Sequence, residues 1–381
     1  MSQLKVNELT NINNTGEPNI ELHSDGSTSI RNLQNLAENV IINPEMKIHQ
    51  RGGSVTGDGD FPVDRWKISK NDHGAYSGTQ SADHPSGFGQ SIQISCATAK
   101  ASLSAGSNFV LFQRIEGFNV QPFAKALTDP KPFSVSFWFK TNKTGNYAVI
   151  LRDIVNNRSV SHMINVTASA TWVEYSHTFP ADATGGWPSS NTNALEFQLW
   201  LCAGTDFTSG SLNTTWNSNT NANMAVGQAN FFDSTSNECF LTGVQLTPTE
   251  APIEFQHKGM QEYLSDCQRY TYALTNANQS AYLPINGFAK TSSQVVVVIN
   301  YPVTMRVDDP GFTLKNDATN FKVFVRASTA SVTNITGSDQ TANGGCYNIF
   351  AAANSFDAGD SVVLGTGSAA GGDGFIISAE L

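Results

Sequence analysis

Three segments in the middle of the chain alternate between apolar and polar side chains: residues 132–140, 171–179 and 194–202. A period of two predicts β-strands, because successive side chains point to opposite faces of a sheet. Turns rich in Gly, Asn and Pro separate the segments, which favours an antiparallel, jelly-roll-like β-sandwich with one packed face per sheet. The residues expected to face the core are Phe133, Val135, Phe137, Phe139, Val173, Tyr175, His177, Phe179, Leu195, Phe197, Leu199 and Leu201.

A second set of short apolar runs follows residue 274 and predicts another group of strands. Short strands at this spacing are typical of a compact all-β domain, so we expect a second, smaller β-sandwich. The run 302–312 is less regular and leaves the strand order of this domain open. The strand candidates are 294–301, 320–327, 331–335, 346–352, 361–364 and 374–380.

The segment 238–274 connects the two predicted domains. It begins as a strand that Pro248 and Pro252 end, because a proline ring offers no N–H to a sheet ladder. A stripe at spacings of three or four follows and predicts a short helix packed on an apolar surface. The strand residues expected on one side are Phe240, Thr242, Val244 and Leu246, and the helical stripe is Met260, Leu264, Cys267 and Tyr270.

Residues 1–34 alternate only weakly and are rich in Asn, Thr and Gly. Such a segment cannot bury enough apolar surface to fold alone, so it is either an arm for attachment or oligomerisation, or a flexible leader. The predicted organisation is an N-terminal arm (1–34), a jelly-roll-like β-sandwich (35–256), a helical connector (257–274) and a small C-terminal β-sandwich (275–381).

Composition narrows the classes of function. Charged residues make up only 14% of the chain and the net charge is −10, which disfavours a nucleic-acid groove lined by Lys and Arg. The five cysteines are odd in number, widely spaced and without a C-x-x-C pair, so we expect free, mostly buried thiols and no zinc. Residues 1–14 lack the apolar core of a signal peptide, and the longest aliphatic run, 295–299, is too short to cross a bilayer.

Ordered motifs in the connector, and at the start of the sandwich, resemble segments of the tail-fibre and head-decoration proteins of tailed bacteriophages. The connector residues that match are Phe240, Gly243, Val244, Gln245, Leu246, Phe255, His257, Cys267, Gln268, Arg269 and Tyr270. The opening residues that match are Gln50, Arg51, Gly52, Asp64, Arg65 and Trp66. Residues 375–381 resemble the last strand of the same proteins, and the sandwich is similar to the carbohydrate-binding-module shape.

This resemblance implies a virion protein that assembles in the host cytoplasm as a homotrimer and contacts other proteins of the capsid or tail. The N-terminal arm would attach it to the particle. Trp66 is expected to anchor the core, since large aromatic side chains dominate core burial. The residues Cys267, Arg269 and Tyr270 are expected to have structural roles.

Three tryptophans point to the polar side of the middle strands. If their strands are neighbours, Trp138, Trp172 and Trp200 form one patch, and exposed apolar patches mark binding surfaces. The patch is either a glycan platform, a subunit interface, or a surface covered by a loop or by the second domain. The polar residues expected to contact a glycan are Glu174, Glu196 and Gln198, and further loop candidates for stacking are Trp187 and Trp216.

Catalytic and metal sites have weaker support. Glu174 and Glu196 are the only pair that suggests the two carboxylates of a glycosidase, and nothing distinguishes them from ordinary polar-face residues. Asp58, Asp60 and Asp64 lie close together in a Gly-rich loop and are weak Ca²⁺ candidates, but the spacing of a full calcium loop is absent. We therefore expect no enzyme activity, no cofactor, and a solvated acidic turn at these aspartates.

The sequence predicts a two-domain, all-β, non-enzymatic virion structural protein that presents a β-sandwich surface. The first alternative is a lectin-like tail fibre that recognises host surface glycan. The weaker alternative is a tailspike that degrades polysaccharide.

Overall fold

The computed structural model describes residues 8–9, 20–22, 28–30, 37–275, 282–315, 317–326, 328–366 and 373–381. Within the predicted arm, β1 (Glu8–Leu9), β2 (Ile20–Leu22) and β3 (Thr28–Ile30) pair as a three-stranded antiparallel sheet. The rest of residues 1–34 lies outside the described part of the chain, so the roles predicted for the arm stay predictions.

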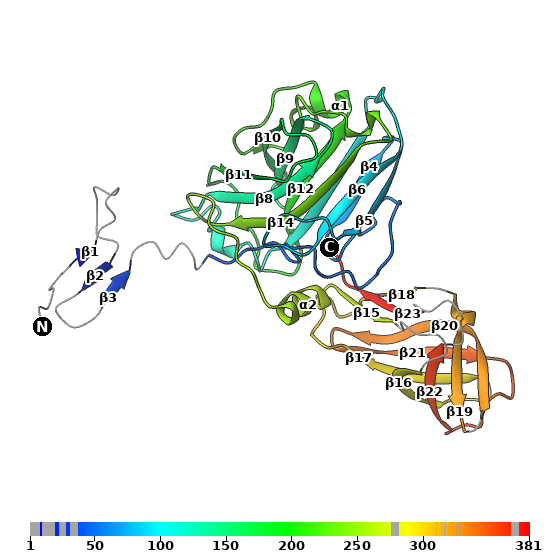
Figure 1. Cartoon of the computed structure of the whole chain (residues 1–381). Coiled ribbons are helices and arrows are strands. Elements are labelled where there is room, and N and C mark those ends of the chain that lie inside the picture. The colour runs from blue at the N-terminus through cyan, green and yellow to red at the C-terminus, as the bar shows by residue number, and fades with distance from the viewer. Residues whose placement is uncertain are drawn as a thin grey trace, which may run out of the picture.

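The first large unit is an antiparallel β-sandwich, as predicted (Figure 1). One sheet has six strands in the order β13-β10-β9-β12-β7-β4, and the other has five in the order β11-β8-β14-β6-β5. Their bounds are β4 (Lys67–Asn71), β5 (Ala75–Ser81), β6 (Ser91–Thr98), β7 (Asn108–Glu116), β8 (Phe133–Thr141), β9 (Gly145–Asp153), β10 (Arg158–Val166), β11 (Val173–Phe179), β12 (Asn193–Ala203), β13 (Asn217–Ser218) and β14 (Glu238–Thr247).

The core lies between these two sheets. The expected inward residues of β8 and β12 are all buried there. Trp66 is fully buried in the same core, where its ring meets Phe197 edge-on at 5.9 Å and its indole N–H donates to the carbonyl of Asn43 at 3.1 Å. Burial of such large rings supplies most of the hydrophobic stabilisation of a sandwich.

Strand β14 changes the face that it turns to the core halfway along its length. Cys239 and Leu241 point into the core before an irregularity in its pairing with β8, and Val244 and Leu246 point into it afterwards. Gly243 lies within the irregularity with a φ of 62°. An extra residue in one strand reverses the alternation, so the prediction that Phe240 and Thr242 share a side with Val244 is wrong.

The connector forms the helix α2 (Met260–Gln268), at the position predicted. Its buried residues are Tyr263 and Cys267, which pack with Ile48, whereas Met260 is 58% exposed. The prediction that Met260 belongs to the buried side of the helix is therefore wrong, and the predicted set omits the buried Tyr263. The Tyr263 hydroxyl donates to Oε1 of the buried Glu45 at 2.6 Å, and the Lys47 ammonium pairs with Oε2 at 2.7 Å.

Other helical turns are short. They are α1 (Thr205–Thr208), η2 (Gln121–Phe123), η3 (Asn221–Asn223), η4 (Phe231–Asp233) and η5 (Ala318–Asn320). Among the described residues, no helix has the length and apolar character needed to cross a bilayer. Four of the five cysteines are buried and all are free thiols, as expected from their spacing.

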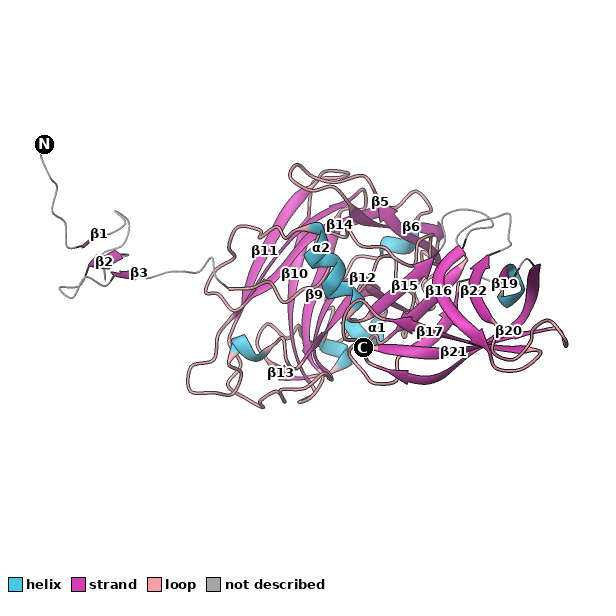
Figure 2. Ribbon diagram, turned by 90° about the horizontal axis from the view of Figure 1, so that it is seen from below, coloured by secondary structure: helices cyan, strands magenta, loops and turns pink. Residues whose placement is uncertain are grey.

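The C-terminal unit is also all-β, and the expected small sandwich takes the form of a closed barrel with a sheet beside it (Figure 2). The sheet has the order β15-β23-β18, and the barrel closes in the order β16-β17-β21-β20-β19-β22. Closure leaves no free edge in the barrel. The bounds are β15 (Thr271–Thr275), β16 (Tyr282–Ala289), β17 (Gln294–Asn300), β18 (Gly311–Leu314), β19 (Phe321–Val325), β20 (Ser328–Thr341), β21 (Gly344–Ala351), β22 (Ser361–Thr366) and β23 (Gly374–Ser378).

The two β units meet at a cluster of buried ionic groups, near the C-terminus in Figure 1. The Glu380 carboxylate pairs with the guanidinium groups of Arg65 and Arg51, and its side chain is only 8% exposed. Arg65 also lies over the Tyr270 ring, with its Cζ atom 3.5 Å from the ring centroid. Arg269 of the connector forms a bidentate pair with another buried carboxylate in β7. Charges at this depth are retained only with close partners, so the cluster fixes the two units against each other.

Candidate functional site

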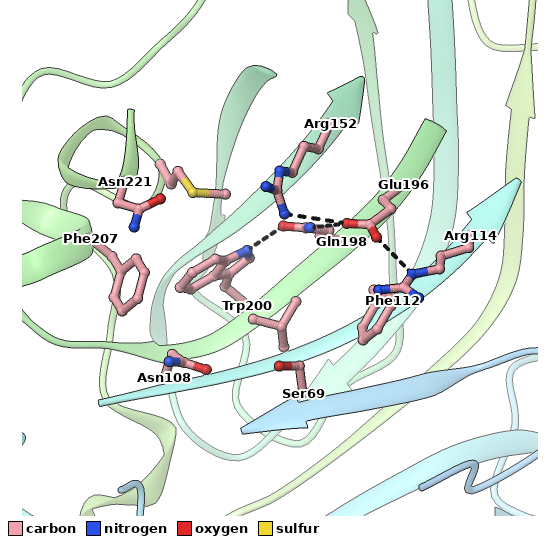
Figure 3. A pocket seen from close by; sticks show the side chains of 12 residues that line it. Ser69, Asn108, Phe112, Arg114, Arg152, Glu196, Gln198, Trp200, Phe207 and Asn221 are labelled. Atoms are coloured by element: carbon pink, nitrogen blue, oxygen red, sulfur yellow. Dashed lines mark hydrogen bonds and ion pairs between the residues drawn. The ribbon is translucent and has the colours of Figure 1, made fainter. Parts of the chain in front are cut away.

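A pocket lies on the outer face of the six-stranded sheet (Figure 3). Its volume is about 260 Å³. Strands β4, β7, β9 and β12 form its floor, and the segment that carries α1 and η3 forms one wall. The lining residues are Ser69, Asn108, Val110, Phe112, Arg114, Arg152, Glu196, Gln198, Trp200, Phe207, Asn221 and Met224.

Strand register explains why these side chains gather on one face. Directly opposite residues of an antiparallel pair share a face, and Glu196 of β12 lies opposite Arg114 of β7 and Arg152 of β9. The sheet therefore carries a row of cation, anion and cation across three strands. The next row holds Ile150, Gln198, Phe112 and Lys67, and the one after it holds Trp200, Val110 and Ser69.

A chain of hydrogen bonds runs along β12. The Trp200 indole N–H donates to Gln198 Oε1 at 3.0 Å, and Gln198 Nε2 donates to Glu196 Oε2 at 2.8 Å. Arg114 Nε then donates to Glu196 Oε1 at 2.9 Å. Glu196 is only 3% exposed, so these donors replace the water that an ionised carboxylate would otherwise need. The polar groups are thus held in fixed positions before any ligand arrives.

Apolar side chains complete the pocket next to Trp200. The indole is 4% exposed and lies 5.1 Å from the Phe207 ring, measured between centroids. Met224 packs with it, and Gln228 Nε2 donates to the Trp200 carbonyl at 3.1 Å. The wall segment is therefore anchored to the sheet. Trp200 forms an enclosed side of the pocket and not the open platform that was expected.

The three tryptophans predicted to form one patch do not come together. Trp138 lies on β8, and Trp172 directly precedes β11, in the five-stranded sheet on the opposite side of the sandwich from Trp200. Trp138 and Trp172 are both half-buried. The Trp172 indole N–H donates to Asp83 Oδ1 at 2.9 Å, and its ring lies 6.2 Å from that of Phe240. The prediction of a common patch is wrong for Trp200, because β8 and β12 belong to different sheets. Trp138 and Trp172 do share the outer face of the five-stranded sheet, since β8 and β11 are neighbouring strands.

The loop tryptophans pack within the fold. Trp216 is 7% exposed in the main core, and its indole N–H donates to the Pro180 carbonyl at 2.9 Å. Trp187 is half-buried, with its ring 6.0 Å from Phe133 and 5.3 Å from the ammonium of the buried Lys125. Trp216 is therefore enclosed, whereas Trp187 keeps some accessible surface in a small pocket of about 90 Å³.

The suggested carboxylate pair is also separated. Glu174 is exposed on β11, where it lies opposite Trp138, whereas Glu196 lies on the other sheet. The two side chains therefore lie on opposite outer faces of the sandwich. A glycosidase needs its two carboxyl groups about 5–10 Å apart, and these two do not provide that arrangement.

The aspartates proposed as weak Ca²⁺ candidates bind different partners. Asp58 accepts from the Lys70 amide at 2.8 Å, and Asp60 accepts from the Gly57 amide at 2.6 Å. Asp64 is buried at the domain junction, where burial raises its pKa to about 6 although Arg51 favours its ionised form. No set of three or more potential metal ligands converges anywhere in the described residues.

The structure adds Arg114 and Arg152 to the site, and the sequence reading did not include them. Each is a single cation within an apolar strand, in the runs FQRIE and ILRD. A charged residue on the outward face of an apolar strand can be recognised in the sequence as a candidate site residue. Which residue of the neighbouring strand lies opposite to it depends on the strand order. That order is set by contacts between distant segments, so the row with Glu196 could not be read from the sequence.

No protein-family model and no curated protein matches the sequence. Among solved structures, the enzymatically active domain of bacteriophage CBA120 tailspike protein 4 matches at 16% identity with a TM-score of 0.30, over 55% of this chain and 21% of that chain. TmCBM61 in complex with β-1,4-galactotriose matches at 11% identity and a TM-score of 0.29, over 56% of this chain and 99% of that chain. The family 11 carbohydrate-binding module of Lic26A-Cel5E from Clostridium thermocellum matches at 10% identity and a TM-score of 0.28, over 53% of this chain and 98% of that chain. Likeness of this degree does not bear on function.

Proposed function

We propose that this protein binds glycan in the pocket on the outer face of the six-stranded sheet and performs no catalysis. The observation that carries the proposal is the fixed row of polar groups beside the half-buried ring of Phe207, which offers the accessible apolar surface because Trp200 is enclosed. A sugar presents hydroxyl groups along its edges and C–H groups on its faces, so it needs both kinds of partner in one place. Ligand sites in proteins generally combine apolar surface with a few convergent polar groups in this way.

Preorganisation supports the same proposal. Glu196 and Gln198 already share their hydrogen bonds with each other and with Trp200, so their orientations are fixed in the free protein. A ligand then loses less affinity to the ordering of side chains than it would on a flexible surface. The volume of about 260 Å³ is at the small end for ligand pockets and suits one or two sugar units of a longer chain.

The charged groups in the pocket support binding without hydrolysis. Glu196 is the only carboxylate among the lining residues, and its oxygens accept hydrogen bonds from Arg114, Asn193 and Gln198. Glycoside hydrolysis in most families uses one carboxyl group as the acid and a second as base or nucleophile. A lone, fully engaged carboxylate fits the role of a fixed acceptor and positioning group.

The binding test uses the full chain and a glycan panel, with affinities measured by isothermal titration calorimetry. Gln198→Ala removes the hydrogen bonds of this side chain, worth about 1 kcal/mol each, and should weaken glycan binding about tenfold. Asn221→Trp places a large ring at the exposed mouth of the pocket and should block binding without disturbing the core. Trp172→Ala, on the opposite sheet, is the matched control and should leave the affinity unchanged.

Two results would overturn this assignment. The first is an absence of binding to every glycan of the panel by the unmodified protein. The second is loss of binding in Trp172→Ala with full binding in Asn221→Trp, which would move the site to the five-stranded sheet. A cooperative thermal unfolding transition in every variant confirms that the comparison is between folded proteins. Gln198→Ala should melt at a lower temperature, because it removes the hydrogen-bond partner of the Trp200 indole and of Glu196 Oε2.

We also propose that the protein is carried on a virion as a homotrimer and contacts other virion proteins. The sequence motifs that resemble phage tail-fibre and head-decoration proteins support this proposal. Five residues of these motifs, Gln50, Arg51, Asp64, Arg65 and Tyr270, lie at the buried junction between the two units of the chain. Light scattering on the purified full chain should give the mass of three copies. A monomeric mass at micromolar concentration would contradict the trimer.

A further inference from the structure

We propose that the pocket selects glycans that carry a carboxylate, which binds between Arg114 and Arg152. This rests on the proposed glycan-binding function and specifies the class of ligand. The row of Arg152, Glu196 and Arg114 contains two cations and one anion, so it carries one uncompensated positive charge. A single ligand carboxylate would balance it.

The two guanidinium groups retain unused donors. A guanidinium has five N–H bonds, and Arg114 uses its Nε atom for Glu196. Arg152 approaches Glu196 only through Nη1, at 3.9 Å, and its buried Nε atom has no hydrogen-bond partner among the described residues. The terminal N–H groups of the partly exposed Arg152 guanidinium are the donors that a ligand carboxylate would reach from solvent.

The position of these donors favours a ligand over an internal partner. Both arginine side chains are about one third exposed, at 35% and 36%, so they can be reached from solvent through the pocket. Glu196 is buried beneath them and already accepts from Gln198, so it does not need the remaining arginine donors. The planar fork of a guanidinium matches the two oxygens of a carboxylate.

The neighbouring row adds to the positive potential. Lys67 lies opposite Phe112, one row from Arg114, and burial together with the Arg114 guanidinium lowers the pKa of the Lys67 ammonium. The protein as a whole has a net charge of −10, so this cluster of cations stands against the general charge of the molecule. A local excess of the opposite sign selects and attracts anionic ligands.

The test compares acidic polysaccharides with their neutral forms. Polygalacturonate, alginate, hyaluronan and polysialic acid are each titrated into the full chain, beside the carboxyl-reduced counterpart of each. At least one acidic polymer should bind about tenfold tighter or more than its reduced form. The preference should shrink between about 50 mM and about 300 mM NaCl, because salt screens charges near the surface.

Variants then locate the effect. Arg152→Gln keeps a hydrogen-bond donor but removes the charge, so it should lower the affinity for the acidic polymer about tenfold and leave the reduced form unchanged. Lys131→Gln removes an exposed lysine from the loop before β8 and is the matched control. It should change neither affinity.

The outcomes separate the two proposals. Equal affinity for the acidic and reduced forms overturns the carboxylate site while glycan binding stands. Equal loss of both forms in Arg152→Gln, or an equal effect of Lys131→Gln, also overturns it. If neither form of any polymer binds, and the neutral panel is also negative, both proposals fail.

Discussion

Glu196 lies on the outer face of a sheet, yet it is almost fully buried. Its carboxylate separates two guanidinium groups that would otherwise face each other across β12. Glu196 therefore contributes to stability, because its negative charge compensates the positive charges of Arg114 and Arg152. The same residue therefore links the fold of the sheet to the chemistry of the pocket.

Replacement of Glu196 by Gln should lower the free energy of unfolding by about 1–2 kcal/mol. The substitution leaves Arg114 and Arg152 as an uncompensated pair, and their partial exposure keeps the cost below that of a fully buried pair. Urea denaturation measures the difference. Glu174→Gln, an exposed carboxylate on the other sheet, is the control and should change stability by less than about 0.5 kcal/mol. Equal effects of the two variants would contradict this role for Glu196.

Histidines in apolar surroundings should lower the free energy of unfolding at acidic pH. Burial lowers the pKa of His73 to about 4, and burial with the stacked His162 ring lowers that of His177 to about 4. The unfolded chain has the ordinary value of 6.5, so it binds more protons than the folded protein below that pH. Stability is complete above about pH 6.5 and falls as the pH drops toward 4.

The variant His73→Phe should reduce this pH dependence. His73 is 1% exposed, its Nε2 atom has no hydrogen-bond partner in the described part of the chain, and its ring lies 4.5 Å from that of Phe232, so a phenyl ring suits the site. The fall in the free energy of unfolding between pH 6.5 and pH 4 should shrink by roughly 2 kcal/mol. Denaturation curves at several pH values measure it. A variant with the pH dependence of the parent would show that His73 does not titrate on unfolding.

At the scale of elements, the bulge in β14 depends on one glycine. Gly243 has a φ of 62°, and a Cβ atom there would lie 2.7 Å from the Phe88 ring. Phe88 is itself packed against Phe255 and His257, so it cannot move away freely. The bulge lets Cys239 and Leu241, and then Val244 and Leu246, all face the same core.

Substitution of Gly243 by Ala should destabilise the sandwich by about 1–3 kcal/mol, because it combines a strained φ with a steric overlap. Gly89 is the matched control, since nothing lies within 4 Å of a Cβ atom at that position. Chemical denaturation of the two alanine variants gives the comparison. If Gly243→Ala costs no more than Gly89→Ala, the bulge tolerates a side chain.

The sequence predicts single elements better than their neighbours. Alternation identified the buried faces of β8 and β12, because that pattern is local. It could not assign the two strands to different sheets, so Trp138 and Trp200 were wrongly placed side by side. The sequence does not predict strand β16, because Pro284 and Gly287 interrupt its alternation. The residues predicted to share a face of β14 are wrong in its first half, because the hydrophobic pattern does not reveal the bulge at Gly243.

At the scale of the whole molecule, the two β units share a junction of paired charges. Arg65 and Arg51 outweigh the burial that opposes ionisation and hold the pKa of Glu380 below its usual value. The ionised carboxylate compensates two guanidinium groups and also accepts from the Thr271 hydroxyl at 3.0 Å. The contact therefore joins the start of the sandwich to the first and last strands of the C-terminal unit.

Replacement of Glu380 by Gln should weaken this junction by about 3–5 kcal/mol, because it leaves the buried Arg65 charge without its partner. In differential scanning calorimetry we expect the parent to unfold in one transition and the variant in two, one for each β unit. Glu250→Gln, at an exposed turn, is the control and should retain one transition. Identical thermograms for the two variants would contradict a coupling role for Glu380.

Strand β7 connects this junction with the binding pocket. Arg65 Nη2 donates to the Arg114 carbonyl at 2.6 Å, and Arg269 holds Glu116 at the end of the same strand. If the pocket binds a glycan as proposed, a force on that glycan would pass along β7 directly into the C-terminal unit, with no flexible linker between them. A rigid connection through β7 transmits force after only a small movement of the pocket. A protein anchored through its C-terminal unit would therefore resist flow as soon as the pocket contacts a glycan surface.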